Sequence, residues 1–118
     1  MLPKRHRLRK PTEFTSVLRG GGRGGARRAG TPSLVVHGRR VDPDAQRPAR
    51  VGFVVSSAVG NSVVRHRVTR QLRGLMADRI THWPHGTDVV VRANPIAAQC
   101  DSMSLQRDLD RALARVLG

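Results

Sequence analysis

Aliphatic residues recur every three or four positions in the middle of this chain, between residues 61 and 80. Each residue advances about 100° around a helix, so these side chains fall within an arc of roughly 80°, the width of a stripe that faces a core. They are Val64, Val68, Leu72 and Leu75. The pattern predicts a helix over residues 61–80, with Asn61 or Ser62 as its N-cap.

Two other segments have apolar residues at helical spacing. Residues 11–19 are predicted as a short helix because Pro11 suits a first turn, Gly20 suits a stop, and apolar side chains lie between them. Those side chains are Phe14, Val17 and Leu18. A final helix is predicted to begin at about Ser102, because four aliphatic side chains repeat on one face. They are Leu105, Leu109, Leu113 and Val116.

Three short runs rich in β-branched residues are predicted as strands because Gly and Pro bound them. They are SLVVHG (33–38), VGFVVS (51–56) and DVVVRANP (88–95). The segment between the first two is predicted as a turn-rich loop. The element order α-β-β-α-β-α predicts a small α+β sandwich, one domain over residues 1–118, in which the helix over 61–80 packs on a short sheet.

Two basic segments lie outside these elements. Residues 1–10 carry five basic side chains within seven positions and are predicted as a basic arm that is too charged to fold alone; these are Lys4, Arg5, Arg7, Arg9 and Lys10. The segment GGGRGGARRAG (20–30) is predicted as a flexible Gly/Arg loop. It lacks the Gly-Lys-Ser/Thr of a phosphate-binding P-loop, so contact with RNA is an option beside the simpler interpretation of a mobile connection.

Positive charge dominates the chain, with 22 Lys and Arg against 8 Asp and Glu, a formal net charge of +14 and a pI of about 12.0. On the predicted helix over 61–80, Arg65, Arg67, Arg70 and Arg73, with His66 among them, occupy the side opposite the aliphatic stripe. A merely solvated helix would interleave acids with these residues, and the only acid is Asp78, at the end. The surface therefore predicts a polyanionic partner, with nucleic acid the leading candidate.

The rest of the composition offers little chemistry. The single cysteine, Cys100, excludes an internal disulfide and a multi-cysteine zinc site. His82 and His85 have ligand-like spacing but few residues to complete a metal site, and the dispersed acids form no clustered pair for metal-dependent cleavage. No protein-borne active site is therefore expected. The chain also lacks an apolar run that could cross a bilayer and the apolar core of a secretory signal, so a soluble cytoplasmic protein is expected.

One block of the sequence resembles a known family. RVGFVVSSAVGNSVVRHRVTRQLRG (50–74) resembles the signature block of the bacterial ribonuclease P protein subunit, and LRKPTEF, SLVVHG and DVVVRANP resemble that family's neighbouring segments in the same order. The resemblance implies the ribosomal protein S5 domain 2-like fold. It also implies a subunit of an endoribonuclease holoenzyme that binds a large catalytic RNA and the 5′ leader of precursor tRNA and assists removal of that leader. The RNA then carries catalysis and holds the Mg²⁺, and neither a membrane nor a small-molecule substrate is expected.

The same resemblance implies roles for particular residues. Contact with the catalytic RNA would fall to Asn61, Arg65, His66, Arg67, Arg70 and Arg73, and RNA binding would extend to Lys4, Arg5, Arg7 and Arg9 of the basic arm. The cleft for the 5′ leader would include Phe14, Leu18, His37 and Phe53.

This chain departs from the family pattern at several of these positions. His66 replaces the usual Asn, and Leu18 and His37 occupy places that are often aromatic, so weaker stacking of the leader is expected. Two alternatives remain open at this point. One is a non-catalytic binder of structured RNA, such as a ribosomal component. The other is a helix-turn-helix regulator that binds DNA, which is disfavoured because a strand rather than a helix is predicted before GNSVVRHR.

Overall fold

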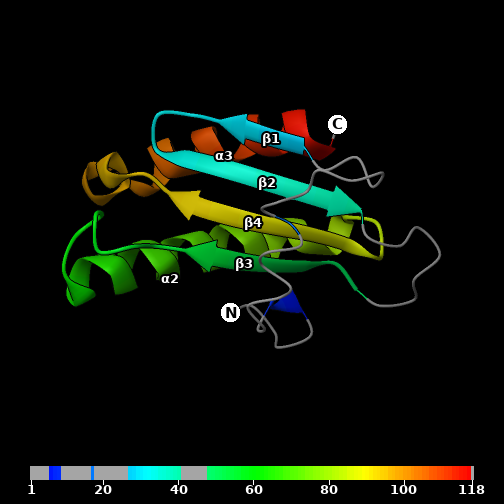
Figure 1. Ribbon diagram of the computed structural model, residues 1–118, viewed down its shortest axis with the longest axis horizontal. Helices are drawn as coiled ribbons and strands as arrows, with labels where there is room; N and C mark the ends of the chain where they lie inside the picture. The colour runs from blue at the N-terminus through cyan, green and yellow to red at the C-terminus, as the bar shows by residue number, and fades with distance from the viewer. Residues whose placement is uncertain (1–5, 9–16, 18–26, 41–47, 118) are drawn as a thin grey trace.

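Four strands form one sheet in the order β1-β2-β4-β3 (Figure 1). The computed structural model describes residues 6–8, 17, 27–40 and 48–117. The strands are β1 (Arg27–Gly30), β2 (Leu34–Arg40), β3 (Arg50–Val54) and β4 (Thr87–Ala93). Strand β2 pairs antiparallel with β1 and with β4, whereas β3 runs parallel to β4. The sheet is therefore mixed, and its one parallel pair is joined through a helix.

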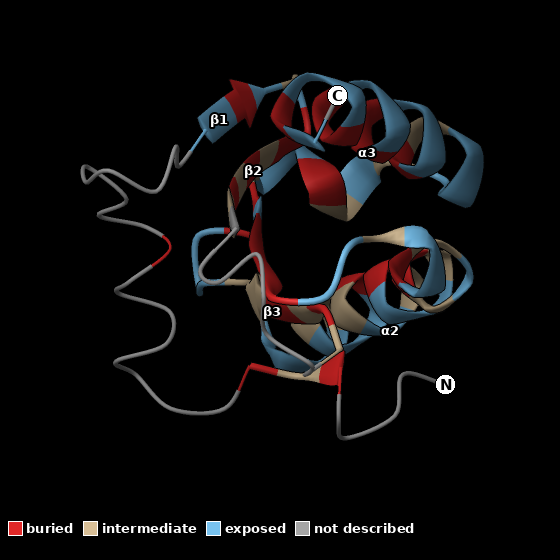
Figure 2. Ribbon diagram, turned by 90° about the vertical axis from the view of Figure 1, so that its right-hand side faces the viewer, coloured by how far each residue is buried: buried red, intermediate tan, exposed pale blue. Residues whose placement is uncertain are grey.

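Both long helices cover the same face of this sheet. Helix α2 (Ser62–Arg79) connects β3 to β4, and helix α3 (Ser102–Leu117) follows β4. Short 3₁₀ helices, η2 (Ile80–His82) and η3 (Pro95–Gln99), follow α2 and β4. Figure 2 shows α2 and α3 side by side on one side of the sheet. This arrangement confirms the predicted small α+β fold, in which the arginine-rich helix packs on a short sheet.

Helix α2 begins where the sequence predicts. The Asn61 Oδ1 accepts a hydrogen bond of 3.0 Å from the backbone N–H of Val64, which satisfies one of the free donors of the first turn. Val68 and Leu72 of the predicted stripe are buried, and Met76 continues the stripe in place of Leu75, which is half-buried. The helix therefore faces the sheet with the side that its aliphatic pattern indicates.

The main core lies between the sheet and the helices. Alternate residues of the strands point into it, among them Leu34 and Val36 of β2 and Val89 and Val91 of β4. A buried carboxylate anchors α3 to the turn before β2, because Asp108 Oδ2 accepts hydrogen bonds from the Ser33 N–H and hydroxyl at 3.2 and 2.5 Å. The opposite face of the sheet, which α2 and α3 leave uncovered and where Leu8 and the helical residue Val17 pack against Val90, is called here the open face.

The prediction that residues 20–30 are a flexible loop is wrong for Arg27–Gly30, which form strand β1. This strand pairs with β2 from Arg27 opposite Gly38 to Gly30 opposite Val35. Its one buried side chain is Ala29, which joins the core beneath α3. A single buried alanine gives almost no hydrophobic pattern, so the strand depends on contacts that the local sequence does not reveal. Residues 20–26 lie outside the described residues.

Part of the predicted basic arm is also folded onto the domain. The Leu8 N–H donates to the Val51 carbonyl at 3.0 Å, and Nδ1 of His6 donates to the Ala49 carbonyl at 2.8 Å. Both side chains are only 6% exposed. The net charge of the arm does not reveal this packing, which depends on Leu8, because Leu8 packs on the open face against Val17 and Val90. Residues 1–5 and 9–10 of the arm lie outside the described residues.

The predicted helix over 11–19 also falls mostly outside the described residues. Its one described residue, Val17, is helical and 1% exposed.

Candidate nucleic-acid interface

Basic side chains of helix α2 converge on a hollow of about 720 Å³ beside the N-terminal segment. Its basic lining residues are Arg7, Arg65, His66, Arg70 and Arg73. We call this surface the α2 hollow. The structure thus brings together four of the five α2 residues that the sequence predicts to bind RNA. It adds Arg7 from the basic arm, because residues 6–8 are held along the edge of β3.

Arg65 is less exposed than the other basic residues that α2 contributes to the α2 hollow. Its side chain is half-buried, and its Nε is shielded from solvent without a hydrogen-bond partner among the described residues. A buried donor that stays unpaired costs on the order of 1–3 kcal/mol. No described carboxylate contacts Arg65, Arg70 or Arg73, so an external anion is the natural acceptor for this group.

Arg67 differs from its neighbours on α2. Its Nη2 donates to the backbone carbonyl of Ala98 in η3, and the side chain does not line the α2 hollow. One turn further along, Gln71 Nε2 donates to the Ser102 hydroxyl at 3.4 Å. These two contacts tie α2 to the junction between η3 and α3, so Arg67 has a bracing role within the fold whatever else it binds.

Asn61 is likewise used by the fold. Its Oδ1 caps α2, and the residue does not line the α2 hollow. Its amide N–H₂ group is left exposed beside the first turn of the helix.

A second hollow of about 600 Å³ lies on the open face of the sheet. It is lined by Arg28 of β1, His37 of β2 and Arg92 of β4, together with the segment after β3 at Ser56 and Ala58. We call it the sheet hollow. Burial lowers the pKa of His37 below its usual value of about 6.5, and the nearby positive charges of Arg28 and Arg92 lower it further. The imidazole is therefore held neutral between two cations.

Phe53 does not share this hollow, and the prediction that it lines one cleft with His37 is wrong. The register pairs Phe53 with Val91, whereas His37 pairs with Val90. Successive residues of a strand point to opposite faces, so Phe53 lies on the helix-covered face, where it packs against the main core. Phe14 and Leu18, the other residues predicted for the cleft, lie outside the described residues.

The sequence analysis missed Arg28 and Arg92. Arg92 interrupts an apolar run, Val89–Val91, and strand alternation alone places it on the face opposite Val91. Arg28 carried no such signal, because it lies in the glycine-rich segment that was predicted as a loop.

Four of the five described carboxylates are used within the fold. Asp88 accepts from Arg50 Nε and Nη2 at 3.1 and 3.0 Å, Asp110 pairs with Arg79, and Asp108 binds Ser33. Asp101 accepts from the Ser104 N–H, which lowers the pKa of its carboxyl. Within the described ranges, no three His, Cys, Asp or Glu side chains gather as a metal site would require. Nor does any described helix have the length and apolar character needed to cross a membrane.

Comparisons with known proteins agree on one family. The sequence profile of the family described as Ribonuclease P matches residues 2–117. The ribonuclease P protein component of Streptomyces bikiniensis is 50% identical over 124 residues, covering 100% of this chain and 97% of its own. That of a Nocardioides species is 47% identical over 116 residues, covering 98% of this chain and 95% of its own.

Solved structures show the same fold. The RNase P protein from Staphylococcus aureus superposes with a TM-score of 0.79 at 22% identity, covering 96% of this chain and 98% of its own. The RNase P protein from Thermotoga maritima gives a TM-score of 0.75 at 22% identity, covering 95% of this chain and 98% of its own.

Proposed function

The chain belongs to the ribonuclease P protein family, and on that premise we propose that it binds the catalytic RNA of the enzyme through the α2 hollow. Membership makes it a protein subunit of an endoribonuclease that processes precursor tRNA, with catalysis carried by the RNA. The family assignment replaces both alternatives, a ribosomal component and a DNA-binding regulator.

The observation that carries the proposal is the group of α2 arginines that line the α2 hollow. Arg65, Arg70 and Arg73 converge there without a carboxylate from the described residues, and the Arg65 Nε is shielded from solvent and unpaired. Phosphate oxygens of a structured RNA supply the missing acceptors, and guanidinium groups can grip them with two parallel hydrogen bonds. His66 adds a ring that can donate to phosphate or stack on a base.

The 5′ leader is assigned to the sheet hollow. Two features support this assignment: its basic lining, and its separation from the α2 hollow by the short connection between β3 and α2. Val55 and Ser62 line the α2 hollow, whereas Ser56 and Ala58 line the sheet hollow. One protein can therefore hold two RNA segments on either side of this connection.

Mg²⁺ is assigned to the RNA rather than to the protein. Mg²⁺ takes oxygen ligands in octahedral geometry, and four of the five described carboxylates are already used for ion pairs, a cap or a buried anchor. The described donor set therefore does not fit a Mg²⁺ site. Precursor tRNA is made in the cytoplasm, and that is where we expect this subunit to act.

The test is cleavage of precursor tRNA at low Mg²⁺ by the catalytic RNA of the same organism, with and without the protein. Wild-type protein should accelerate cleavage, and the double variant Arg65→Gln/Arg70→Gln should lose most of that effect and of the affinity for the RNA. Arg111→Gln/Arg115→Gln removes the same charge from exposed positions of α3 that line neither hollow and should behave as wild type. If both double variants lost acceleration and RNA affinity equally, net charge alone would explain the effect, and the assignment of RNA binding to the α2 hollow would be contradicted.

A further inference from the structure

Three side chains from three adjacent strands meet on the open face of the sheet. Arg28 lies directly opposite His37 in the pairing of β1 with β2, and Arg92 lies opposite Val35 in the pairing of β2 with β4. Directly paired residues point to the same face, and a diagonal neighbour two positions along lies about 7–8 Å away. Strands β1 and β4 lie on either side of β2 (Figure 1), so Arg28 and Arg92 approach His37 from opposite sides and line the same hollow with it.

No acid of the described residues compensates these two arginines. Among the described residues, neither Arg28 nor Arg92 has a hydrogen-bond or ion-pair partner. The acid on this face of β4 is Asp88, which is bound by both Nε and Nη2 of Arg50. Asp88 also lies four positions from Arg92, about 13 Å along the strand. Two like charges that flank one side chain repel each other until an anion lies between them.

The lining of the sheet hollow favours a phosphate over a base. Proteins that bind single strands commonly stack bases on aromatic side chains, and none of the described residues that line this hollow is Phe, Tyr or Trp. Phe53, the aromatic residue of the neighbouring strand, lies on the opposite face. Arginine forks instead match the two free oxygens of a phosphodiester.

We propose that Arg28 and Arg92 clamp one backbone phosphate of the 5′ leader above His37, so that these three residues hold the leader by charge and hydrogen bonding rather than by base stacking. The inference rests on the proposed function, because it takes the leader as the occupant of the sheet hollow. The imidazole lies beneath the phosphate, where its N–H can donate a third hydrogen bond.

The first experiment compares leader lengths in the holoenzyme. Affinities of the holoenzyme are measured for precursor tRNA with a long leader and with a one-nucleotide leader, for wild type and for Arg28→Gln/Arg92→Gln. The variant should lose about tenfold affinity for the long-leader substrate and keep its affinity for the short-leader substrate. The slope of the logarithm of its binding constant against the logarithm of salt concentration should also become shallower by roughly 0.7, the value expected for the loss of one phosphate contact. The charge-matched variant Arg111→Gln/Arg115→Gln should match wild type on both substrates.

The second experiment separates phosphate from base. Neutral methylphosphonate linkages are placed one at a time along the leader, and abasic nucleotides are placed at the same positions in a second set. One methylphosphonate should weaken wild-type binding about as much as the double variant does and should have no further effect in that variant, whereas the abasic substitutions should have little effect. Strong loss with abasic leaders and none with methylphosphonate would overturn the clamp in favour of stacking.

Failure of the clamp and failure of the proposed function give different results. If wild-type protein shows no preference for the long leader at all, then the leader is not bound by this protein and the proposed function itself is wrong in that part. If wild type prefers the long leader and Arg28→Gln/Arg92→Gln does so equally, then only the clamp is overturned. Circular dichroism and binding to the catalytic RNA confirm that the variant is folded and assembled in either case.

Discussion

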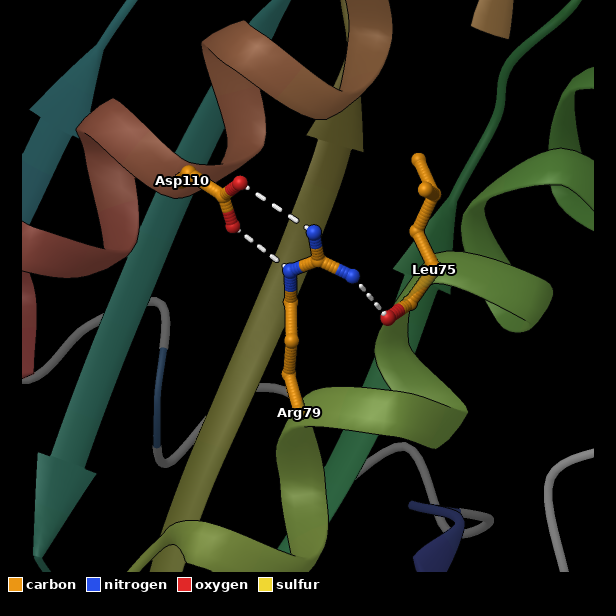
Figure 3. A network of polar contacts seen from close by, with 3 residues as sticks. All are labelled: Leu75, Arg79 and Asp110. Atoms are coloured by element: carbon orange, nitrogen blue, oxygen red, sulfur yellow. Dashed lines mark hydrogen bonds and ion pairs between the residues drawn. The ribbon is translucent and has the colours of Figure 1, made fainter. Parts of the chain in front are cut away.

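Arg79 of α2 and Asp110 of α3 join the two helices on the side away from the sheet (Figure 3). Nε and Nη2 of Arg79 donate to the two carboxylate oxygens of Asp110 at 2.5 and 3.1 Å. The third nitrogen, Nη1, donates to the Leu75 carbonyl one turn back along α2. Through this bond the side chain also contacts the last turns of its own helix. One guanidinium group therefore links the C-terminal end of α2 to α3.

The Arg79–Asp110 pair should contribute little to global stability. The side chains are 20% and 50% exposed, and exposed ion pairs typically contribute less than about 1 kcal/mol. We therefore expect Asp110→Asn to lower the free energy of unfolding by less than about 1 kcal/mol in urea titrations, with the difference shrinking as salt is added. Asp78→Asn, at an exposed acid with no hydrogen bond to Arg79, should have a smaller effect. A loss of several kcal/mol that persists in high salt would contradict this assignment.

Two valines of α2 should respond in opposite ways to the same substitution. Val68 is fully buried in the core, whereas Val63 is 75% exposed. Val68→Asp places an unpaired charge in an apolar interior and should unfold the domain, because that burial costs more than the few kcal/mol that hold a small domain together. Val63→Asp should keep the helical circular-dichroism spectrum. Retention of that spectrum by Val68→Asp would show that α2 packs differently.

The elements that the sequence predicted well are those with a local cause. Helix α2 has both an apolar stripe and an Asn61 cap within its own residues, so its bounds were predicted to within a residue at each end. Strand β1 has only Ala29 to bury, and it forms because β2 and α3 are beside it. No pattern within Arg27–Gly30 could have revealed that.

The faces of β3 could not be assigned from its sequence either. In VGFVVS both alternating sets are largely apolar, with Val51 and Phe53 in one and Val54 in the other. Each set does pack, since the first faces the main core and Val54 faces Leu8 and Val17. Which of the two sets faces the main core is decided by the side of the sheet on which α2 and α3 pack. The prediction for Phe53 failed on this point, whereas His37 could be assigned to a cleft from the resemblance alone.

For the arginines of α2 too, some properties could be predicted from the local sequence and others depend on residues far along the chain. Their excess over acids was visible in the sequence, but the partner of Arg67 is the Ala98 carbonyl, 31 residues away. Arg65 and Arg67 should therefore separate binding from stability. Arg65→Gln should weaken binding to the catalytic RNA by about 1–3 kcal/mol with little change in the free energy of unfolding.

Arg67→Gln should instead lower the stability of the free protein by about 1 kcal/mol, because it removes the hydrogen bond to η3. Urea titration of each variant without RNA, followed by filter binding at fixed salt, measures both quantities. If Arg67→Gln were as stable as wild type and Arg65→Gln were destabilised, the two roles would have to be exchanged.

His37, which lies between Arg28 and Arg92, should make the stability of the domain depend on pH. Burial and the two cations lower the pKa of His37 in the folded protein, whereas the unfolded chain keeps a value of about 6.5. Below that value the unfolded state binds more protons than the folded state, so stability falls as the pH drops from 7 towards the lowered pKa. His37→Gln should reduce this loss, which is measured by urea titration at pH 7.0 and 5.5.

Bound RNA should act on His37 in the opposite direction. A phosphate placed between Arg28 and Arg92 offsets their positive charge and favours the imidazolium, so the pKa of His37 should rise when single-stranded RNA is added. NMR titration of the imidazole resonances measures the value with and without RNA. In Arg28→Gln/Arg92→Gln, the pKa of His37 should be higher than in wild type without RNA, and it should not rise further when RNA is added. A pKa that RNA leaves unchanged in the wild-type protein would place the phosphate elsewhere.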